Sequence, residues 1–359
     1  DLSSIKMHPF QEKIDKLLVI INTPGLEAID ERQKASLAEL CCEINFFDIA
    51  QKLTSDLEKK LVIWNKKLVE TWSGKAKNYS LSIVNKKLTF RINYQDDNID
   101  WSPLSIIPIQ SLTLYSCKTV NLSFMENMPV EDLHIEGCPQ ILDLSHLIKL
   151  KLKSFTLRGM LKIKDLTPLS NSELNTLIIE DCPLILTLKP LIRQPIKAIT
   201  LYRTSTLFEF KDLRSFSLEQ LTFKGCPVNI LEFLNSKKLN YFDTQWGKVG
   251  DISRLKNSPL EYLNLSDNPI TNIAPLENMK IKVLLLKNCK IANIEILLSL
   301  KNLETLFISL NCLPPGWAET IVKMKDQIKQ IRNFQDNNYI TVEKFLEENK
   351  EFNINNPRK

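Results

Sequence analysis

The chain has 359 residues, 43% of them hydrophobic, and its 47 basic and 42 acidic side chains leave a formal net charge of +5. Neither charge sign forms a long block, no apolar run reaches membrane-spanning length, and only 8 glycines are present. These features argue against a nucleic-acid-binding arm, membrane insertion and a glycine-rich phosphate loop. The three histidines lie apart from any cysteine or carboxylate cluster, so we expect no metal site and no cofactor.

Residues 1–76 carry apolar side chains at spacings of three and four, which predict helices. We expect one helix after Pro9, a second from about 26 to 53, and a third that begins in the capping box Ser55–Glu58. These apolar stripes could line a cofactor groove, but amphipathic faces usually pack on a core, so this segment is predicted to form an N-terminal helical cap. The stripe of the third helix contains Leu57, Leu61, Trp64, Leu68 and Trp72.

A β-hairpin is expected after these helices. Residues 79–84 and 87–92 alternate apolar and polar side chains around Asn85-Lys86, and the second strand should open the repeats that follow. Residues 100–107 complete an irregular first turn.

Ten repeats of about 22 residues follow, and this regular period is the strongest signal in the chain. In each repeat two apolar side chains flank an outward residue, as Leu263 and Leu265 flank Asn264, which predicts a short strand with both leucines buried. A second apolar pair, such as Ile273 and Leu276, should line the convex side of the core. The repeats begin at Ile109, Val130, Leu152, Leu174, Ile196, Leu218, Leu239, Leu260, Ile281 and Leu303.

One column of the repeats is rich in cysteine. The five cysteines follow one another along an apolar wall, at most one per repeat. They are therefore predicted to be buried free thiols, and neither a disulfide framework nor a metal or redox site. Free cysteines of this kind are consistent with a reducing compartment, so we expect a cytoplasmic location. Separately, because the sequence begins at Asp1 and not at a methionine, we expect a processed chain or a fragment of a longer protein. The column contains Cys117, Cys138, Met160, Cys182, Thr204, Cys226, Gly247, Asn268, Cys289 and Asn311.

The period breaks after Pro314-Pro315. The pattern then predicts a helix over 317–328, a short strand over 329–334 and a final helix over 341–349, while residues 352–359 are expected to fray. Because the end of a repeat array needs a polar outer face, residues 314–359 are predicted to form a C-terminal α/β cap on the repeat domain of residues 77–313.

Residues 260–279 and 281–313 resemble the short type of bacterial leucine-rich repeat, of about 22 residues, found in internalin-like proteins. The resemblance implies an α/β fold, a leucine-rich-repeat solenoid with a curved parallel sheet. The order of helical segment, hairpin, turn, repeats and tail also resembles the repeat region that follows the kinase domain in large bacterial serine/threonine protein kinases. The chain has no glycine-rich nucleotide loop, no His-Arg-Asp triplet and no Asp-Phe-Gly, so a kinase domain would lie upstream of Asp1.

The outward strand residues are predicted to form a concave face with two main columns. Mixed charges with interspersed tyrosines are typical of a protein-binding face, although threonines are also good strand formers and charges can simply be solvated. The central column contains Thr113, His134, Thr156, Ile178, Thr200, Thr222, Asp243, Asn264, Leu285 and Phe307. The next column contains Tyr115, Glu136, Arg158, Glu180, Tyr202, Lys224, Gln245, Ser266, Lys287 and Ser309.

We predict that a protein or peptide ligand binds one region of this face. The least regular repeat lies there, with Thr244 at an inward apolar position and residues 246–250 in place of the usual turn, and local departures from a pattern often mark function. Decay of an unneeded repeat would produce the same departure. The predicted binding residues are Arg158, Glu180, Tyr202, Lys224, Tyr241 and Tyr262.

Three classes of function are compatible with this pattern. A non-catalytic protein–protein interaction module, which could be the regulatory part of a larger kinase-like chain, agrees best with it. An enzyme would need converging acid, base or nucleophilic residues, and the spacing reveals none. A structural spacer would have a concave face without the tyrosines at 202, 241 and 262.

Overall fold

The computed structural model describes Lys34, Ala38 and residues 57–72, 78–93, 99–118, 122–204, 208–226, 228–234, 237–309, 312–333 and 340–349. The helices predicted before residue 57, position 311 and the tail after residue 349 lie outside this part of the chain, apart from Lys34 and Ala38, which are helical.

Within the described residues, one 13-stranded sheet has a spatial order that follows the chain from β1 to β13. Strands β1 and β2 form the predicted antiparallel hairpin, and every later strand pairs parallel to the one before it. The strands are β1 (Tyr79–Val84), β2 (Lys87–Asn93), β3 (Ser111–Tyr115), β4 (Asp132–Glu136), β5 (Ser154–Arg158), β6 (Thr176–Glu180), β7 (Ala198–Tyr202), β8 (Gln220–Lys224), β9 (Tyr241–Asp243), β10 (Tyr262–Asn264), β11 (Val283–Leu286), β12 (Thr305–Ile308) and β13 (Gln330–Asn333).

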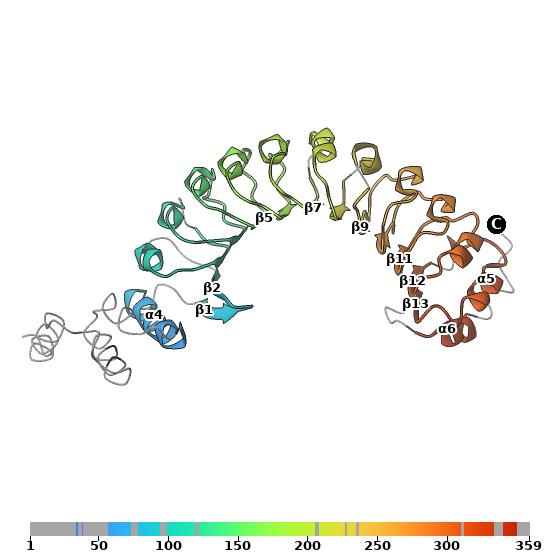
Figure 1. The fold of residues 1–359 in the computed structure, drawn as a ribbon, viewed down its shortest axis with the longest axis horizontal. Helices are drawn as coiled ribbons and strands as arrows, with labels where there is room; N and C mark the ends of the chain where they lie inside the picture. Colours follow the sequence, from blue (N-terminus) through green and yellow to red (C-terminus); the bar gives the residue numbers. More distant parts are fainter. Residues whose placement is uncertain are drawn as a thin grey trace, which may run out of the picture.

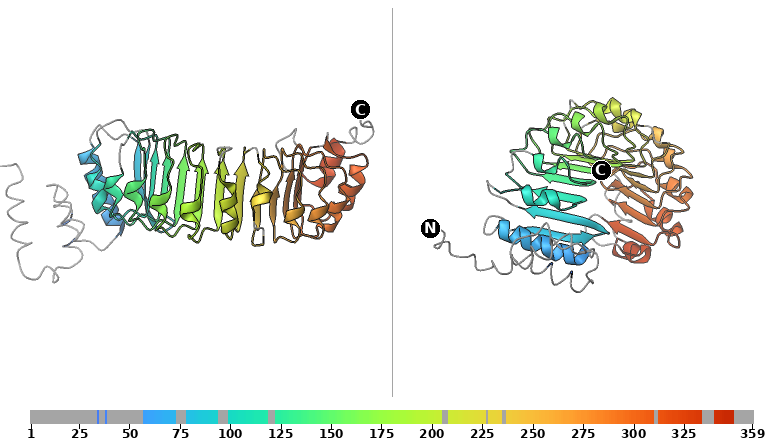
Figure 2. Two further views of the ribbon diagram at one scale, coloured as in Figure 1. Left: turned by 90° about the horizontal axis from the view of Figure 1, so that it is seen from above. Right: turned by 60° about the vertical axis from the view of Figure 1, so that its left-hand side comes forward.

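The molecule is an arc with the strands on its concave side and short 3-10 helices on its convex side (Figures 1 and 2). The predicted leucine-rich-repeat solenoid is therefore confirmed. The α-helices are α4 (Leu57–Thr71), α5 (Trp317–Lys323) and α6 (Val342–Glu348). The 3-10 helices are η3 (Ser102–Ile106), η4 (Ser123–Met125), η5 (Ser145–Leu147), η6 (Thr167–Leu169), η7 (Lys189–Leu191), η8 (Phe210–Ser215), η9 (Ile230–Phe233), η10 (Ser253–Leu255), η11 (Ala274–Leu276) and η12 (Glu295–Ser299).

The strands sit where the period-two pattern places them. Leu263 pairs with Leu284 across β10 and β11, and both side chains are completely buried. A register slip of one residue would turn these leucines to solvent, so the apolar pattern itself fixes the register. One continuous core of such residues runs from Trp64 to Phe345.

The convex turns begin with a side chain that satisfies a backbone donor. In successive repeats the Ser145 and Thr167 N–H groups donate to Asp143 and Asp165, at 2.9 and 2.8 Å. Such Asx turns pre-form the start of each 3-10 helix. The predicted convex apolar pair also points inward, because Ile273 and Leu276 are buried.

The members of the cysteine column that the structure describes, Cys117 to Cys289, are buried as predicted, except that Gly247 is partly exposed. Asn268 shows what a polar member of the column does. Its Nδ2 group donates to the carbonyls of Thr244, Leu265 and Ser266, and its Oδ1 atom accepts the Val249 N–H. Asn268 thereby ties the turn of its own repeat to that of the preceding repeat.

The two ends of the solenoid are helical, with α4 at one end and α5 and α6 at the other (Figure 1). Trp72, directly after α4, is buried and donates its indole N–H to the Asp100 carbonyl at 2.6 Å. The helix predicted over 317–328 was too long: α5 ends at Lys323, and the following turns bring Gln330 beside Thr305 on β12. No helix in the described residues is long and apolar enough to cross a membrane.

Candidate functional site

On β3 to β8 the concave columns predicted from the sequence are cross-strand neighbours in the structure. Farther along, Ser266 and Ser309 of the second column are buried and do not contribute to an exposed face. Thr113, His134 and Thr156 are partners on β3, β4 and β5, and Glu136, Arg158 and Glu180 are partners on β4, β5 and β6. Because successive strands are parallel and in register, side chains one repeat apart in the sequence stand side by side on this face.

Arg158 and Glu180, two predicted binding residues, form an ion pair. The Arg158 Nε atom lies 2.8 Å from one Glu180 carboxylate oxygen and its Nη2 atom 3.3 Å from the other. Glu136 lies 3.8 Å from the same guanidinium and 3.0 Å from the His134 ring. Burial lowers the pKa of His134, although the Glu136 carboxylate opposes that effect. The charges of β4 to β6 are thus largely matched within the chain.

Lys224, the next predicted binding residue, pairs with Asp243. The Lys224 ammonium lies 2.7 Å from the Asp243 carboxylate, which is almost completely buried. The other Asp243 oxygen accepts the Asn264 amide at 3.0 Å. The sequence shows all three residues but does not indicate that the carboxylate would be enclosed, because that depends on side chains from three repeats.

Tyr202 lies at the C-terminal end of β7, within a small cluster. The guanidinium of Arg203 sits over the Tyr202 ring, 4.5 Å from its centroid, and also pairs with Asp181. Gly225, in the next repeat, has a positive φ of 65°, and a Cβ atom there would lie 3.3 Å from Tyr202 Cε2. Because glycine has no Cβ atom, the Tyr202 ring can lie close to the Gly225 backbone.

Tyr241 and Tyr262 are stacked on neighbouring strands, with ring centroids 4.2 Å apart and an interplanar angle of 8°. Both begin their strands, whereas Tyr202 ends β7. Four residues of extended chain correspond to about 13 Å, so the three tyrosines form two separate aromatic groups on opposite rims of the sheet. The structure thus brings together two of the three tyrosines.

The irregular repeat contributes a residue that the sequence-based prediction of the site omitted. Trp246 has a positive φ of 58° and a side chain that is 51% exposed, in a column where other repeats have Gly137, Gly159 or Gly225. A bulky residue is uncommon in that conformation. A tryptophan in a column where three other repeats have glycine was therefore the feature of the sequence that could have identified this residue. The inward Thr244 is completely buried.

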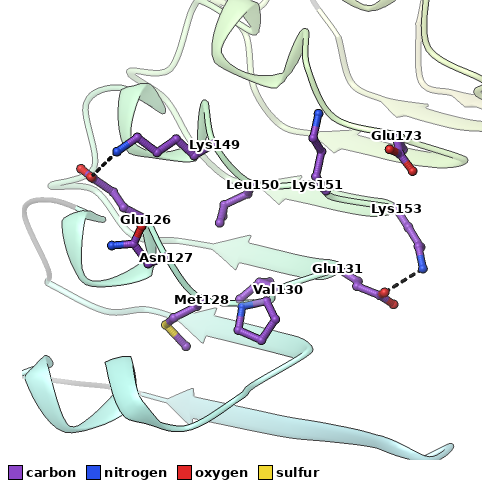
Figure 3. A pocket seen from close by; sticks show the side chains of 11 residues that line it. Glu126, Asn127, Met128, Val130, Glu131, Lys149, Leu150, Lys151, Lys153 and Glu173 are labelled. Atoms are coloured by element: carbon purple, nitrogen blue, oxygen red, sulfur yellow. Dashed lines mark hydrogen bonds and ion pairs between the residues drawn. The ribbon is translucent and has the colours of Figure 1, made fainter.

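A hollow of about 580 Å³ is lined by residues that precede β4, β5 and β6 (Figure 3). Tyr202, Tyr241 and Tyr262 lie on other strands, β7, β9 and β10. The charged side chains of the hollow are largely matched: Lys153 lies 2.7 Å from Glu131, and Lys149 lies 3.7 Å from Glu126. Among the described residues, no group of three His, Cys, Asp or Glu side chains could hold a metal ion. The hollow is lined by Glu126, Asn127, Met128, Pro129, Val130, Glu131, Lys149, Leu150, Lys151, Lys153 and Glu173.

Comparison with known proteins gave structural neighbours only. No protein-family model and no curated protein matches the chain. It is similar to an internalin (inlF) from Listeria monocytogenes str. 4b F2365, with 22% identity and a TM-score of 0.44, over 58% of this chain and 70% of that chain. It is also similar to an internalin C2 (inlC2) from the same strain, with 20% identity and a TM-score of 0.36, over 54% and 76% of the two chains. At these identities, the function of this chain has to be inferred from its own surface.

Proposed function

We propose that this chain is a non-catalytic protein-binding module whose concave face takes a protein or peptide ligand. The observation that carries the proposal is the preformed arrangement of the concave face. Ion pairs hold Arg158, Glu180 and Lys224 in place, and ring contacts hold Tyr202, Tyr241 and Tyr262. Side chains held in this way lose little rotational freedom on binding, and Tyr and Arg are enriched among residues that dominate binding energy.

The parallel sheet supports this proposal. It holds these side chains on β5 to β10, whose strands stand at a fixed spacing of about 4.8 Å. A broad surface of this kind suits a macromolecular ligand better than a small molecule, which would need an enclosing cavity. A regulatory role within a longer kinase-like chain stays a prediction, and the coding sequence upstream of Asp1 would test it.

The test is affinity capture from a lysate of the source organism, with quantification of every recovered protein. The double variant Tyr202→Ala/Tyr241→Ala should lose the partner, because each tyrosine is expected to contribute about 1 to 3 kcal/mol of binding free energy. Circular dichroism should show that the variant stays folded, since neither ring belongs to the continuous core.

Tyr115 provides the matched control. It occupies the same strand position as Tyr202 but lies on β3, outside the predicted site, and is 40% exposed. Tyr115→Ala should recover the partner as wild type does. If wild type and the double variant recover the same proteins in equal amounts, the concave-face assignment is wrong, and residues 1–76 become the segment to test.

A further inference from the structure

Several charged side chains around the aromatic groups already have partners within the chain. Arg203 pairs with Asp181, and Lys224 lies 2.7 Å from Asp243. The two Asp267 oxygens accept hydrogen bonds from Gln245 and Asn288, at 2.9 and 2.7 Å.

The rim beside the stacked tyrosines shows the same matching. The Lys197 ammonium lies 3.0 Å from Glu219, and the Lys282 ammonium lies 2.8 Å from Glu261. The first pair directly precedes β7 and β8, and the second pair directly precedes β11 and β10. Matched charges therefore flank the stacked tyrosines of β9 and β10 on both sides.

A charged ligand group would gain little on such a surface. To pair with Lys224 or Arg203 it would have to displace an existing carboxylate, and it would lose its own hydration on contact. An uncharged aromatic or aliphatic side chain has no such cost. It can cover the rings of Tyr202, Tyr241 and Tyr262, and the favourable contribution to binding is the apolar area removed from water.

The distance between the two aromatic groups also sets the minimum length of a ligand that contacts both. Tyr202 ends β7 and Tyr241 begins β9, so the two rings lie about 13 Å apart along the strands and about 10 Å apart across them. Together these offsets give a separation of about 16 Å. A ligand that contacts both groups must therefore span the width of the sheet.

We propose that the ligand is an extended protein segment that crosses the sheet at β7 to β10 and anchors uncharged aromatic or aliphatic side chains on both aromatic groups. Anchors about five residues apart fit the spacing of about 16 Å. This inference rests on the proposed function, because it specifies the chemistry of the ligand for the same face. Binding of this kind should depend little on salt.

The experiment uses the full chain and a phage-displayed library of random peptides of about twelve residues. Selection is run at about 0.05 M and about 0.5 M salt, conditions that separate exposed charge pairing from apolar contact. We expect enriched peptides with aromatic or aliphatic residues about five positions apart, and affinities that differ by less than about threefold between the two salt conditions.

The outcomes separate this inference from the proposed function. Peptides that need Tyr202 and Tyr241 but are selected for Lys, Arg, Asp or Glu, and are released by salt, would overturn the uncharged ligand and leave the binding function standing. No enrichment, or equal enrichment on wild type and on Tyr202→Ala/Tyr241→Ala, would count against both.

A glycine pair tests the position of Tyr202 without removing the ring. A Cβ atom in Gly225→Ala would lie 3.3 Å from Tyr202 Cε2 and from Arg203 Cγ, so the ring and the arginine on it must shift by a few tenths of an ångström. The control is Gly159→Ala, which has nearly the same φ of 61° but no neighbour closer than 3.8 Å. Both variants carry similar backbone strain, and only Gly225→Ala should weaken the selected peptides, by about tenfold. Equal affinities for the two variants would contradict the placement of the anchor on Tyr202.

Discussion

At the scale of single residues, burial controls the chemistry of Cys182 and Cys289 in the cysteine column, whereas the hydrogen bond with Cys117 lowers the pKa of Cys138. Burial raises the pKa of Cys182 to about 11 and that of Cys289 to about 12. Because the thiolate is the reactive form, both residues should resist a disulfide reagent at pH 8 in the native protein and react rapidly in denaturant. Thiol titration with and without guanidinium, followed by peptide mapping, measures the difference.

Cys312 serves as the internal control for the buried thiols. It is only partly buried, so the reagent can reach it without unfolding the repeats, and it should be labelled before Cys182 and Cys289. Equal labelling rates for the three residues in the native protein would show that the column opens to solvent far more readily than this packing allows.

At the scale of elements, the role of α4 depends on Trp72. The ring has edge contacts with Tyr79, Phe90 and Trp101, at centroid distances of 5.2, 5.9 and 6.1 Å. Trp72→Ala should lower the free energy of unfolding by about 3 to 5 kcal/mol, because it leaves a cavity at the end of the core and removes the indole hydrogen bond to Asp100. Urea denaturation followed by circular dichroism measures this loss.

The control substitution lies on the outer face of α4. Val62 is 69% exposed, so Val62→Ala should change the free energy of unfolding by less than about 0.5 kcal/mol. If Trp72→Ala has as small an effect as Val62→Ala, the helix does not protect the end of the solenoid, and the predicted N-terminal cap would have to be abandoned.

At the scale of the whole molecule, the repeats should be removable as units. Ile281 and Leu303 are equivalent positions one period apart, so deletion of residues 281–302 should let β10 pair directly with β12 in the same register. Stability in such arrays is approximately a sum of repeat and interface contributions, so we expect a folded protein with a lower melting temperature. Circular dichroism and thermal denaturation measure both properties.

A deletion of half a repeat provides the contrast. Removal of residues 281–291 takes away β11 but leaves η12, so the convex half of one repeat would have no strand. This variant should lose cooperative unfolding or fail to fold. If both deletions behave alike, the chain tolerates loss of period, and the stacking of equivalent repeats is not what organises the fold.

The sequence alone was sufficient to predict the architecture. A regular period places equivalent side chains at equivalent positions, so burial of Leu263 and the columns on β3 to β8 follow from one alignment of the repeats. The hairpin of residues 79–92 was predictable for a similar reason, since its signal is local. The end of α5 was not, because it depends on pairing between β12 and β13.

Only the tertiary structure decided how the candidate site is assembled. It paired Arg158 with Glu180, enclosed the Asp243 carboxylate, and placed the ring of Tyr202 against Gly225. The repeat pattern specifies where each Cα atom lies but not the side-chain rotamer, which is chosen by contacts with residues about one or two repeats away. For the same reason, the matched charges and separate aromatic groups of the concave face became visible only when neighbouring repeats were seen together.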